Sequence, residues 1–221
     1  MSRTALVVGA TGLIGRALLR LLLEDPRYRQ IHVLTRRPMP EAERQSVHVV
    51  DFDTMTQVPA VDDVYCCLGT TIKVAGSEAA FSKVDRDYVV TVAKLAHAAG
   101  ASRFLLVSSL GADANSAVFY NRVKGEAEAA VSALGFAELT LARPSMLDGD
   151  RAATGQPPRK GEAVALWLLR PIQRMIPAVW RPIAAETVAR ALVYRAFHPG
   201  APVVESGELQ RLGARSNGSA G

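Results

Sequence analysis

The chain has 221 residues, of which 49% are hydrophobic and 21% charged, and this ordinary composition excludes a disordered, collagen-like or low-complexity protein. Its net charge of +5 arises after position 150, where 10 basic residues stand against 4 acidic ones. Aromatic residues make up only 6% and are not interleaved with clustered Lys and Arg, so nucleic acid is not an expected partner.

The N-terminal stretch carries no signal-peptide pattern, because a short apolar run after Arg3 leads directly into a glycine motif. The chain also has no run of 18 apolar residues. We therefore expect a cytoplasmic protein without an integral membrane segment. The only cysteines, Cys66 and Cys67, are neighbours whose side chains point to opposite faces of a strand, which excludes a disulfide framework. No metal site is predicted.

Short apolar runs alternate with helical patterns along the first 142 residues. The run Thr4–Val8 predicts a strand, and Leu13–Leu23 is apolar at helical spacing and ends before Pro26. Five further strands are predicted at Ile31–Leu34, Val47–Val50, Val64–Leu68, Phe104–Ser108 and Leu139–Ala142, and two further helices at Tyr88–Ala99 and Val118–Leu134. Strands separated by helices indicate an α/β fold with a doubly wound parallel sheet covered on both faces.

After Arg143 the pattern weakens, and we expect a small helical region that covers the substrate side. Residues 148–161 are predicted as a loop, and 163–176 and 186–197 as helices. Arg170 and Arg174 lie among Trp and Leu residues, so the first of these helices is either a lid over the cleft or a surface for a membrane or a partner. Residues 1–205 are expected to form one domain, and 206–221 a disordered tail.

The most specific local signal is the turn after the first strand. Glycines recur every third residue there, which permits a tight turn, a close backbone approach to a pyrophosphate, and packing of helix against strand. The helix N-terminus would add free N–H groups for the anion. Three glycines in an ordinary strand-to-helix turn are the alternative. The predicted dinucleotide-binding residues of this turn are Gly9, Thr11, Gly12, Leu13, Ile14 and Gly15.

The end of the second predicted strand indicates which dinucleotide binds. NAD-binding proteins carry a carboxylate at this place, but here Thr35 is followed by Arg36 and Arg37. Two guanidinium groups can form charge-assisted hydrogen bonds with a 2′-phosphate, which favours NADP(H), although two solvated surface arginines would give the same pattern. By position alone, Asp51 and Phe52 are predicted at the adenine, and Leu68, Gly69 and Thr70 at a cofactor ribose.

Candidate catalytic residues lie on the helix that follows Ser108 and Ser109. Tyr120 and Lys124 are four apart and therefore share a helix face, where the ammonium can favour the phenolate form. Such a Tyr can exchange a proton with a carbonyl oxygen, and a hydroxyl at the carboxyl end of the preceding strand can hold the same oxygen. A Tyr and a Lys at this spacing also occur in many helices by chance.

Together these motifs resemble the short-chain dehydrogenase/reductase superfamily. The closer resemblance is to an atypical branch, the family of the Tat-interacting metastasis-suppressor oxidoreductase and its bacterial relatives. It rests on the blocks Cys66–Thr71, Val84–Val89, Ser108–Asp113 and Val123–Glu126, and spans Leu6 to Phe197. The resemblance implies a Rossmann fold and NADP binding.

The same resemblance implies roles for individual residues. Tyr120 would be the acid/base, Lys124 would lie on the ribose and beside Tyr120, and Ser109, rather than Ser108, would bind the substrate carbonyl. The proton-relay asparagine of many superfamily members has no clear match. Asp85 occupies the helix where it would be sought.

Three functions fit these features. The first is an NADPH-dependent oxidoreductase that reduces a carbonyl or an activated double bond of a small-molecule substrate, with Tyr120 as proton donor. The second is a dinucleotide-sensing regulator without turnover. The third is a sugar-nucleotide epimerase, which chain length disfavours because only about 75 residues follow the last predicted strand. We expect a monomer or a homodimer.

Overall fold

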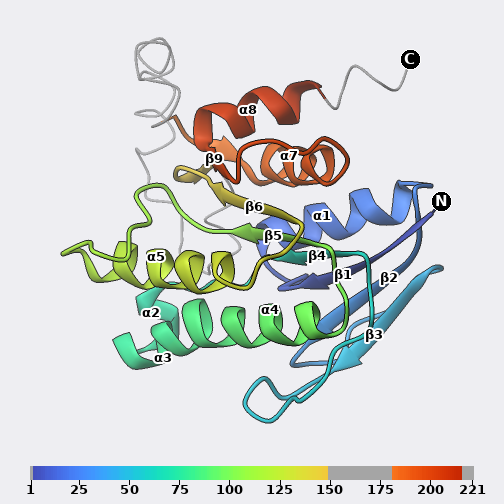
Figure 1. The fold of residues 1–221 in the computed structure, drawn as a ribbon, viewed down its shortest axis with the longest axis horizontal. Helices are drawn as coiled ribbons and strands as arrows, with labels where there is room; N and C mark the ends of the chain where they lie inside the picture. The colour runs from blue at the N-terminus through green and yellow to red at the C-terminus, as the bar shows by residue number, and fades with distance from the viewer. Residues whose placement is uncertain (1, 149–180, 216–221) are drawn as a thin grey trace, which may run out of the picture.

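The structure is a computed structural model that describes residues 2–148 and 181–215. The helix expected at 163–176, with Arg170 and Arg174, and the loop expected beyond position 148 lie outside the described residues. A seven-stranded sheet and two layers of helices make up the described part (Figure 1). The sequence predicted this fold class.

All pairings in the main sheet are parallel, and its strand order is β3-β2-β1-β4-β5-β6-β9. This is the doubly wound Rossmann order, in which the chain reverses its direction across the sheet between β1 and β4. The strands are β1 (Arg3–Val8), β2 (Tyr28–Thr35), β3 (Gln45–Val49), β4 (Asp63–Cys66), β5 (Arg103–Val107), β6 (Glu138–Arg143) and β9 (Val203–Glu205). Six of them were predicted, whereas β9 was not.

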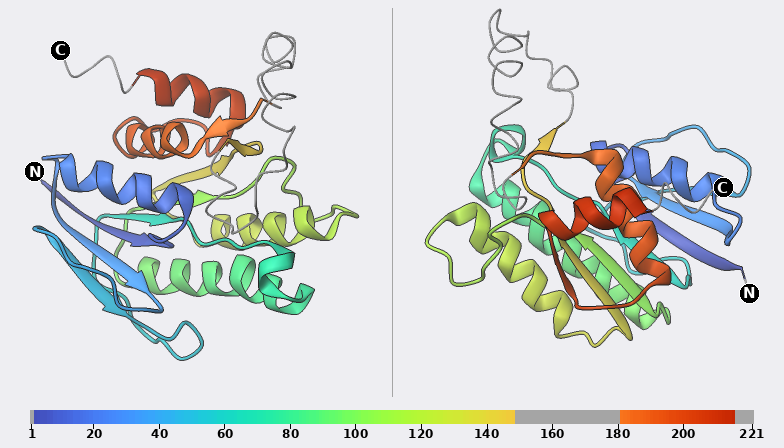
Figure 2. Two further views of the ribbon diagram at one scale, coloured as in Figure 1. Left: turned by 180° about the vertical axis from the view of Figure 1, so that it is seen from behind. Right: turned by 90° about the horizontal axis from the view of Figure 1, so that it is seen from above.

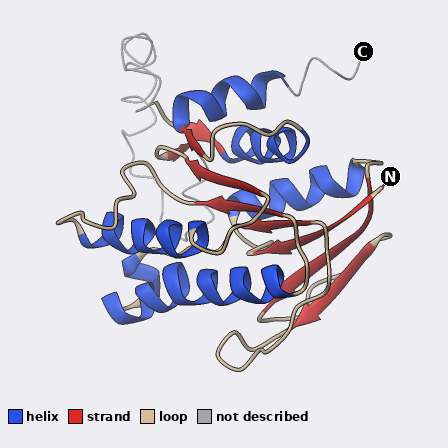
Figure 3. Ribbon diagram, viewed as in Figure 1, coloured by secondary structure: helices blue, strands red, loops and turns tan. Residues whose placement is uncertain are grey.

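Helices cover both faces of the sheet (Figures 2 and 3). One face carries α1 (Leu13–Glu24) and α7 (Ala185–Phe197), on which α8 (Ser206–Arg215) packs. The other face carries α4 (Tyr88–Ala98) and α5 (Phe119–Ser132). Two short helices, α2 (Ile72–Ala75) and α3 (Glu78–Ser82), and a π-helical turn, η1 (Lys83–Asp87), lead into α4, while β7 (Leu147–Asp148) and β8 (Ile183–Ala184) form a separate pair.

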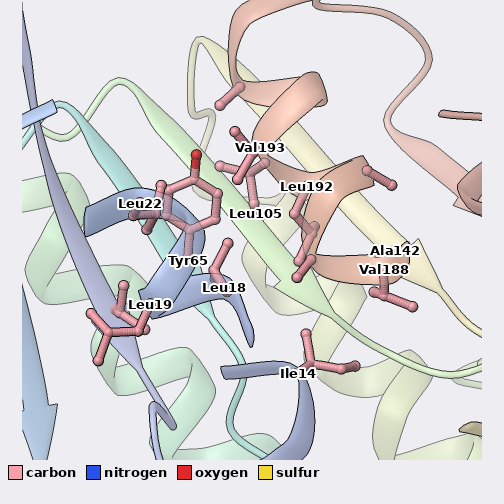
Figure 4. Packing of buried hydrophobic residues seen from close by; sticks show 14 of the residues in the cluster. Ile14, Leu18, Leu19, Leu22, Tyr65, Leu105, Ala142, Val188, Leu192 and Val193 are labelled. Atoms are coloured by element: carbon pink, nitrogen blue, oxygen red, sulfur yellow. The ribbon is translucent and has the colours of Figure 1, made fainter. Parts of the chain in front are cut away.

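Each face of the sheet has its own apolar core. In the first, Leu18 and Leu22 of α1 and Leu192 of α7 are fully buried against the sheet (Figure 4). In the second, Val92 of α4 and Val131 of α5 are fully buried. Both faces of the strands are therefore apolar, which is why the strands read as continuous apolar runs in the sequence.

The prediction of a disordered tail at 206–221 is wrong for residues 206–215, which form α8. Leu209 and Leu212 lie three residues apart on α8 and are buried, so the helix is amphipathic. Gly213 packs so closely on α7 that a Cβ there would lie 2.6 Å from the Thr187 methyl group. Because Arg, Glu and Gln residues surround the two leucines, the sequence pattern did not indicate this amphipathic helix.

A buried polar cluster closes the amino end of the sheet, opposite the carboxyl ends of the strands. Asp63 is fully buried and accepts hydrogen bonds from Tyr28 (2.6 Å) and from guanidinium groups of Arg3 (3.3 Å) and Arg103 (3.1 Å). The Tyr65 hydroxyl lies 2.7 Å from that of Tyr28. Burial raises the pKa of both phenols, so they remain protonated donors, and Tyr65 donates to Tyr28.

Replacing Asp63 with alanine is expected to lower the free energy of unfolding by about 3–5 kcal/mol, because its removal leaves paired cations and a buried phenol without an acceptor. Chemical denaturation measures the change. Tyr65→Phe, which removes one hydroxyl from the same cluster, should cost only about 1 kcal/mol. Equal losses in the two variants would show that the carboxylate is not the centre of the cluster.

Candidate functional site

A pocket of about 670 Å³ opens at the carboxyl ends of the strands, where β1 and β4 lie side by side. Chain segments leave this point in opposite directions, which makes it the usual ligand site of an open parallel sheet. The pocket is lined by the glycine turn after β1, the ends of β2 and β4, and the segment from α2 to α4. Its charged residues are Arg36, Arg37 and Lys83, and no acidic side chain of the described residues lines it.

The glycines of the turn serve two different needs. Gly9 has φ +83° and a Cβ there would lie 2.5 Å from the carbonyl oxygen of Cys67, while a Cβ on Gly15 would overlap the Gly9 backbone. Both glycines are therefore required by packing alone. Gly12 differs, since its φ of −74° suits any residue and a Cβ would meet only Gly9 O, at 3.4 Å. Packing does not explain Gly12, whereas a ligand approaching the pocket wall does.

The turn also presents free backbone donors. Gly12 caps α1, and the first intrahelical bond runs from Arg16 N–H to Gly12 O. The N–H groups of Leu13, Ile14 and Gly15 consequently have no acceptor within the helix, and the first turn contains no acidic residue. Free N–H groups at a helix N-terminus favour an anion such as a pyrophosphate.

Arg36 and Arg37 lie at the rim of the pocket, directly after β2. Both are exposed, and neither guanidinium forms an ion pair with another described residue. Thr35 fixes their turn, since its hydroxyl donates to Arg37 O (2.9 Å) and accepts from Arg37 N–H (3.3 Å). The two cations thus lie at the pocket without an anionic partner among the described residues.

Of the two residues predicted at the adenine, only Phe52 lines the pocket. It is buried and stacks on Tyr88, with ring centroids 5.2 Å apart. Asp51 is exposed and instead accepts a hydrogen bond from Asp53 N–H within its own turn (2.9 Å). The structure therefore does not place Asp51 in the pocket wall.

Sequence reasoning missed two side chains that line the same part of the pocket. Lys83 Nζ lies 2.8 Å from an Asp53 carboxylate oxygen, and the Tyr88 hydroxyl donates to Asp53 Oδ1 at 3.0 Å. These contacts connect η1 and α4 to the loop after β3. Nothing in the local sequence pairs residue 53 with residues 83 and 88, so no sequence signal could have found it.

The segment after β4 forms the opposite wall, and the three predicted residues Leu68, Gly69 and Thr70 all line it. Cys67, half-buried, lines the pocket beside them. Burial raises the pKa of the Cys66 thiol to about 11, so this group is an uncharged part of the core at neutral pH. The cysteines are therefore a structural component of the wall.

The predicted catalytic pair lies next to this wall, on α5. Lys124 is 5% exposed, and a Cβ built on Gly69 would lie 3.6 Å from its Nζ, so the ammonium sits directly behind the Gly69 backbone. Its ion-pair partner is Asp85, at 2.8 Å, and no hydrogen bond joins it to Tyr120 among the described residues. The Tyr120 ring packs on Phe81, with centroids 5.3 Å apart.

The two serines after β5 differ in their contacts. Ser109 is half-buried and its hydroxyl donates to Leu110 O at 3.4 Å, a long hydrogen bond that a ligand can displace. Ser108 is buried, and its hydroxyl has no partner in the described part of the chain. Of the two hydroxyls, only that of Ser108 is without a partner among the described residues.

Comparison with known proteins identifies the family. A family model described as "NAD(P)H-binding" matches residues 9–165, which includes the whole glycine turn. This chain belongs to that NAD(P)H-binding family. It is 35% identical to Protein HTATIP2 of Rattus norvegicus over 98% of this chain and 92% of that protein. It is also 32% identical to Protein FMP52, mitochondrial, of Eremothecium gossypii, over 96% of this chain and 98% of that protein.

Among solved structures, a short-chain dehydrogenase from Burkholderia cenocepacia in complex with NADP has the same fold, with a TM-score of 0.64 and 16% identity. The match covers 99% of this chain and 94% of that one. This likeness confirms the predicted Rossmann fold, and the family model and the relatives confirm the predicted membership of an NAD(P)H-binding family. Because one fungal relative is named mitochondrial, the cytoplasmic location stays a prediction. No helix in the described ranges is long and apolar enough to cross a membrane.

The residues of the pocket fit the dinucleotide of this NAD(P)H-binding family. The open space over Gly12 and the free N–H groups of α1 suit a pyrophosphate. The buried, uncharged wall of Phe52 suits an adenine ring, and the cations at the rim suit phosphate oxygens. The N–H groups, the cations and the apolar wall of the pocket are therefore the kinds of groups that bind a dinucleotide.

Proposed function

We propose that the chain is an NADPH-dependent oxidoreductase of the short-chain dehydrogenase/reductase type, which reduces a small carbonyl compound or an activated double bond. The observation that carries the proposal is the cationic rim formed by Arg36 and Arg37 on a pocket built from the glycine turn, with no acidic side chain among the described lining residues. A 2′-phosphate would provide the missing anion. Lys124, directly behind Gly69, supports placement of the reactive end of the cofactor along the same wall.

In the proposed reaction, different residues of the chain would bind the cofactor, donate the proton and hold the substrate. When bound, the nicotinamide would supply hydride to the substrate. The backbone of the glycine turn would bind the pyrophosphate, and Lys124 would donate a hydrogen bond to a ribose hydroxyl. Tyr120 would donate the proton to the substrate oxygen, and Ser109 would hold that oxygen in place. The helix face shared by Tyr120 and Lys124 keeps both groups on the same side of the sheet.

A screen for consumption of NADPH tests this function. The purified protein is incubated with NADPH and a panel of aldehydes, ketones, quinones and enones, and nicotinamide absorbance is followed. We expect at least one compound to be reduced with many turnovers per protein molecule. Binding of NADPH without consumption across the panel would instead favour an NADP(H)-binding regulatory or sensor protein.

One observation favours the sensor as the second candidate. The Lys124 ammonium is paired with Asp85, and the Tyr120 hydroxyl has no hydrogen bond within the described residues. In a sensor, Tyr120 and Lys124 would contribute only to binding. A small-molecule substrate, a monomeric or homodimeric state and a cytoplasmic location remain predictions under either function.

Replacing Gly12 with valine separates ligand binding from packing at the turn. Because Gly12 has an ordinary φ and open space before it, Gly12→Val should leave the Tm nearly unchanged. The new side chain would occupy the approach to the pocket, so NADPH affinity should fall by about tenfold or more, or about 1.4 kcal/mol. Calorimetry and thermal melting measure the two quantities.

Gly15→Ala is the matched control, since its Cβ would overlap the Gly9 backbone and should lower the Tm. A Gly12→Val protein that binds NADPH as tightly as the unmodified chain would show that the glycine turn is structural only.

A further inference from the structure

Asp85 is a buried carboxylate in an irregular part of the fold. It is 1% exposed and lies in the middle of η1, the π-helical turn between α3 and α4. Single π-helical turns are rare and are frequently found at functional sites. Here the turn directs Asp85 into the protein and leaves its neighbour Asp87 exposed.

The two carboxylate oxygens of Asp85 contact two different segments. One oxygen contacts the pocket wall after β4, and the other contacts α5. Oδ2 accepts a hydrogen bond from Thr70 N–H at 2.9 Å, and Oδ1 lies 2.8 Å from Lys124 Nζ. A Cβ on Gly69 would lie 3.5 Å from Oδ1 and 3.6 Å from Nζ. One carboxylate therefore joins η1, the segment after β4 and α5, next to Gly69 of the pocket wall.

Among the described residues, Asp85 is the acidic side chain that pairs with Lys124. Arg86 and Glu126 connect the same two elements but neutralise each other at 2.8 Å, and no other carboxylate pairs with Lys124 among the described residues. Cys66, on β4, is the near titratable group from the sheet, and its thiol is neutral because burial raises its pKa to about 11.

We propose that Asp85 is a positioning residue for the cofactor site: its carboxylate fixes the Lys124 ammonium beside Gly69 and holds the Thr70 backbone at the same point. The inference rests on the proposed binding of NADP(H) at this wall. Without the carboxylate, the buried ammonium and the Thr70 N–H would both lose their partner. Asp85 thus determines where Lys124 stands when it donates to a ribose hydroxyl.

The test is the NADP⁺ affinity of Asp85→Asn, measured with and without the additional change Lys124→Met. The amide keeps the shape of the side chain and can still accept from Thr70 N–H, but it removes the charge. The affinity of Asp85→Asn should be at least about tenfold weaker than that of the unmodified protein, and adding Asp85→Asn to Lys124→Met should weaken it no further, because Asp85 acts through Lys124. Asp87→Asn, on the same turn but exposed, should match the unmodified protein throughout.

A second measurement uses the protein without cofactor and remains informative if Asp85→Asn folds poorly. The double variant Asp85→Asn/Lys124→Met removes both charges and should be more stable than Asp85→Asn alone, because the single variant leaves a buried ammonium unpaired. Thermal melting compares the two. A double variant no more stable than the single one would overturn the inference.

The outcomes separate this inference from the proposed function. If the unmodified protein binds NADP⁺ and Asp85→Asn weakens binding by the same factor with and without Lys124→Met, Asp85 has only a structural role, and the proposed function stands. If the unmodified protein fails to bind NADP⁺ and NADPH, the proposed function fails and the inference fails with it.

Discussion

Replacing both Arg36 and Arg37 with serine is expected to weaken NADPH binding by at least about tenfold and to leave NADH binding nearly unchanged. Each charge-assisted hydrogen bond to a phosphate contributes about 1.5–3 kcal/mol, and exposure at the rim reduces that value. NADH lacks the 2′-phosphate and therefore loses no partner. Titration followed by nicotinamide fluorescence gives both affinities.

Arg29→Ser is the matched control for this double change. Arg29 lies on the same strand, β2, and is exposed, but its guanidinium donates to Ser2 O outside the pocket. It should leave both affinities unchanged. Parallel losses of NADPH and NADH binding in the double variant would mean that the arginines do not recognise the 2′-phosphate.

Changing Tyr120 to phenylalanine is expected to lower turnover by about 10² or more while NADPH affinity stays within a few-fold. The lost hydroxyl acts in the transition state as the proton donor, whereas the ring keeps its packing on Phe81. Steady-state kinetics on a carbonyl found in the screen, together with a binding titration, separate the two effects. Lys124→Ala should lose both turnover and affinity.

Tyr194→Phe on α7 provides the control, because that ring stacks on His198, on the opposite face of the sheet from α5. It should not change turnover. A Tyr120→Phe protein that reduces its substrate at the normal rate would remove Tyr120 from the acid/base role.

The regular parts of the fold were predictable because short apolar runs alternate with stretches that are apolar at helical spacing. Six strands and the helices α1, α4, α5 and α7 were found within a few residues of their observed bounds. The strand β9 has only three residues, and α8 buries only two leucines within a charged sequence. Such short elements depend on tertiary packing, so local pattern does not specify them.

For the site, the sequence predicted residues that follow strands directly, because parallel strands bring their carboxyl ends to one edge. The glycine turn, Arg36, Arg37 and Gly69 line the pocket for this reason. The bonds of Asp85 to Thr70 and Lys124 could not be predicted, since they depend on a π-helical turn and on contacts between distant segments.

The most direct test of the account is a calorimetric titration of the unmodified chain with NADPH and, in the same buffer, with NADH. Arg36 and Arg37 form no ion pair within the described residues, and no acidic side chain is part of the described pocket lining, so we expect NADPH to bind at least about tenfold more tightly. Equal affinities, or tighter binding of NADH, would contradict the assignment of the rim to a 2′-phosphate and with it the proposed use of NADPH.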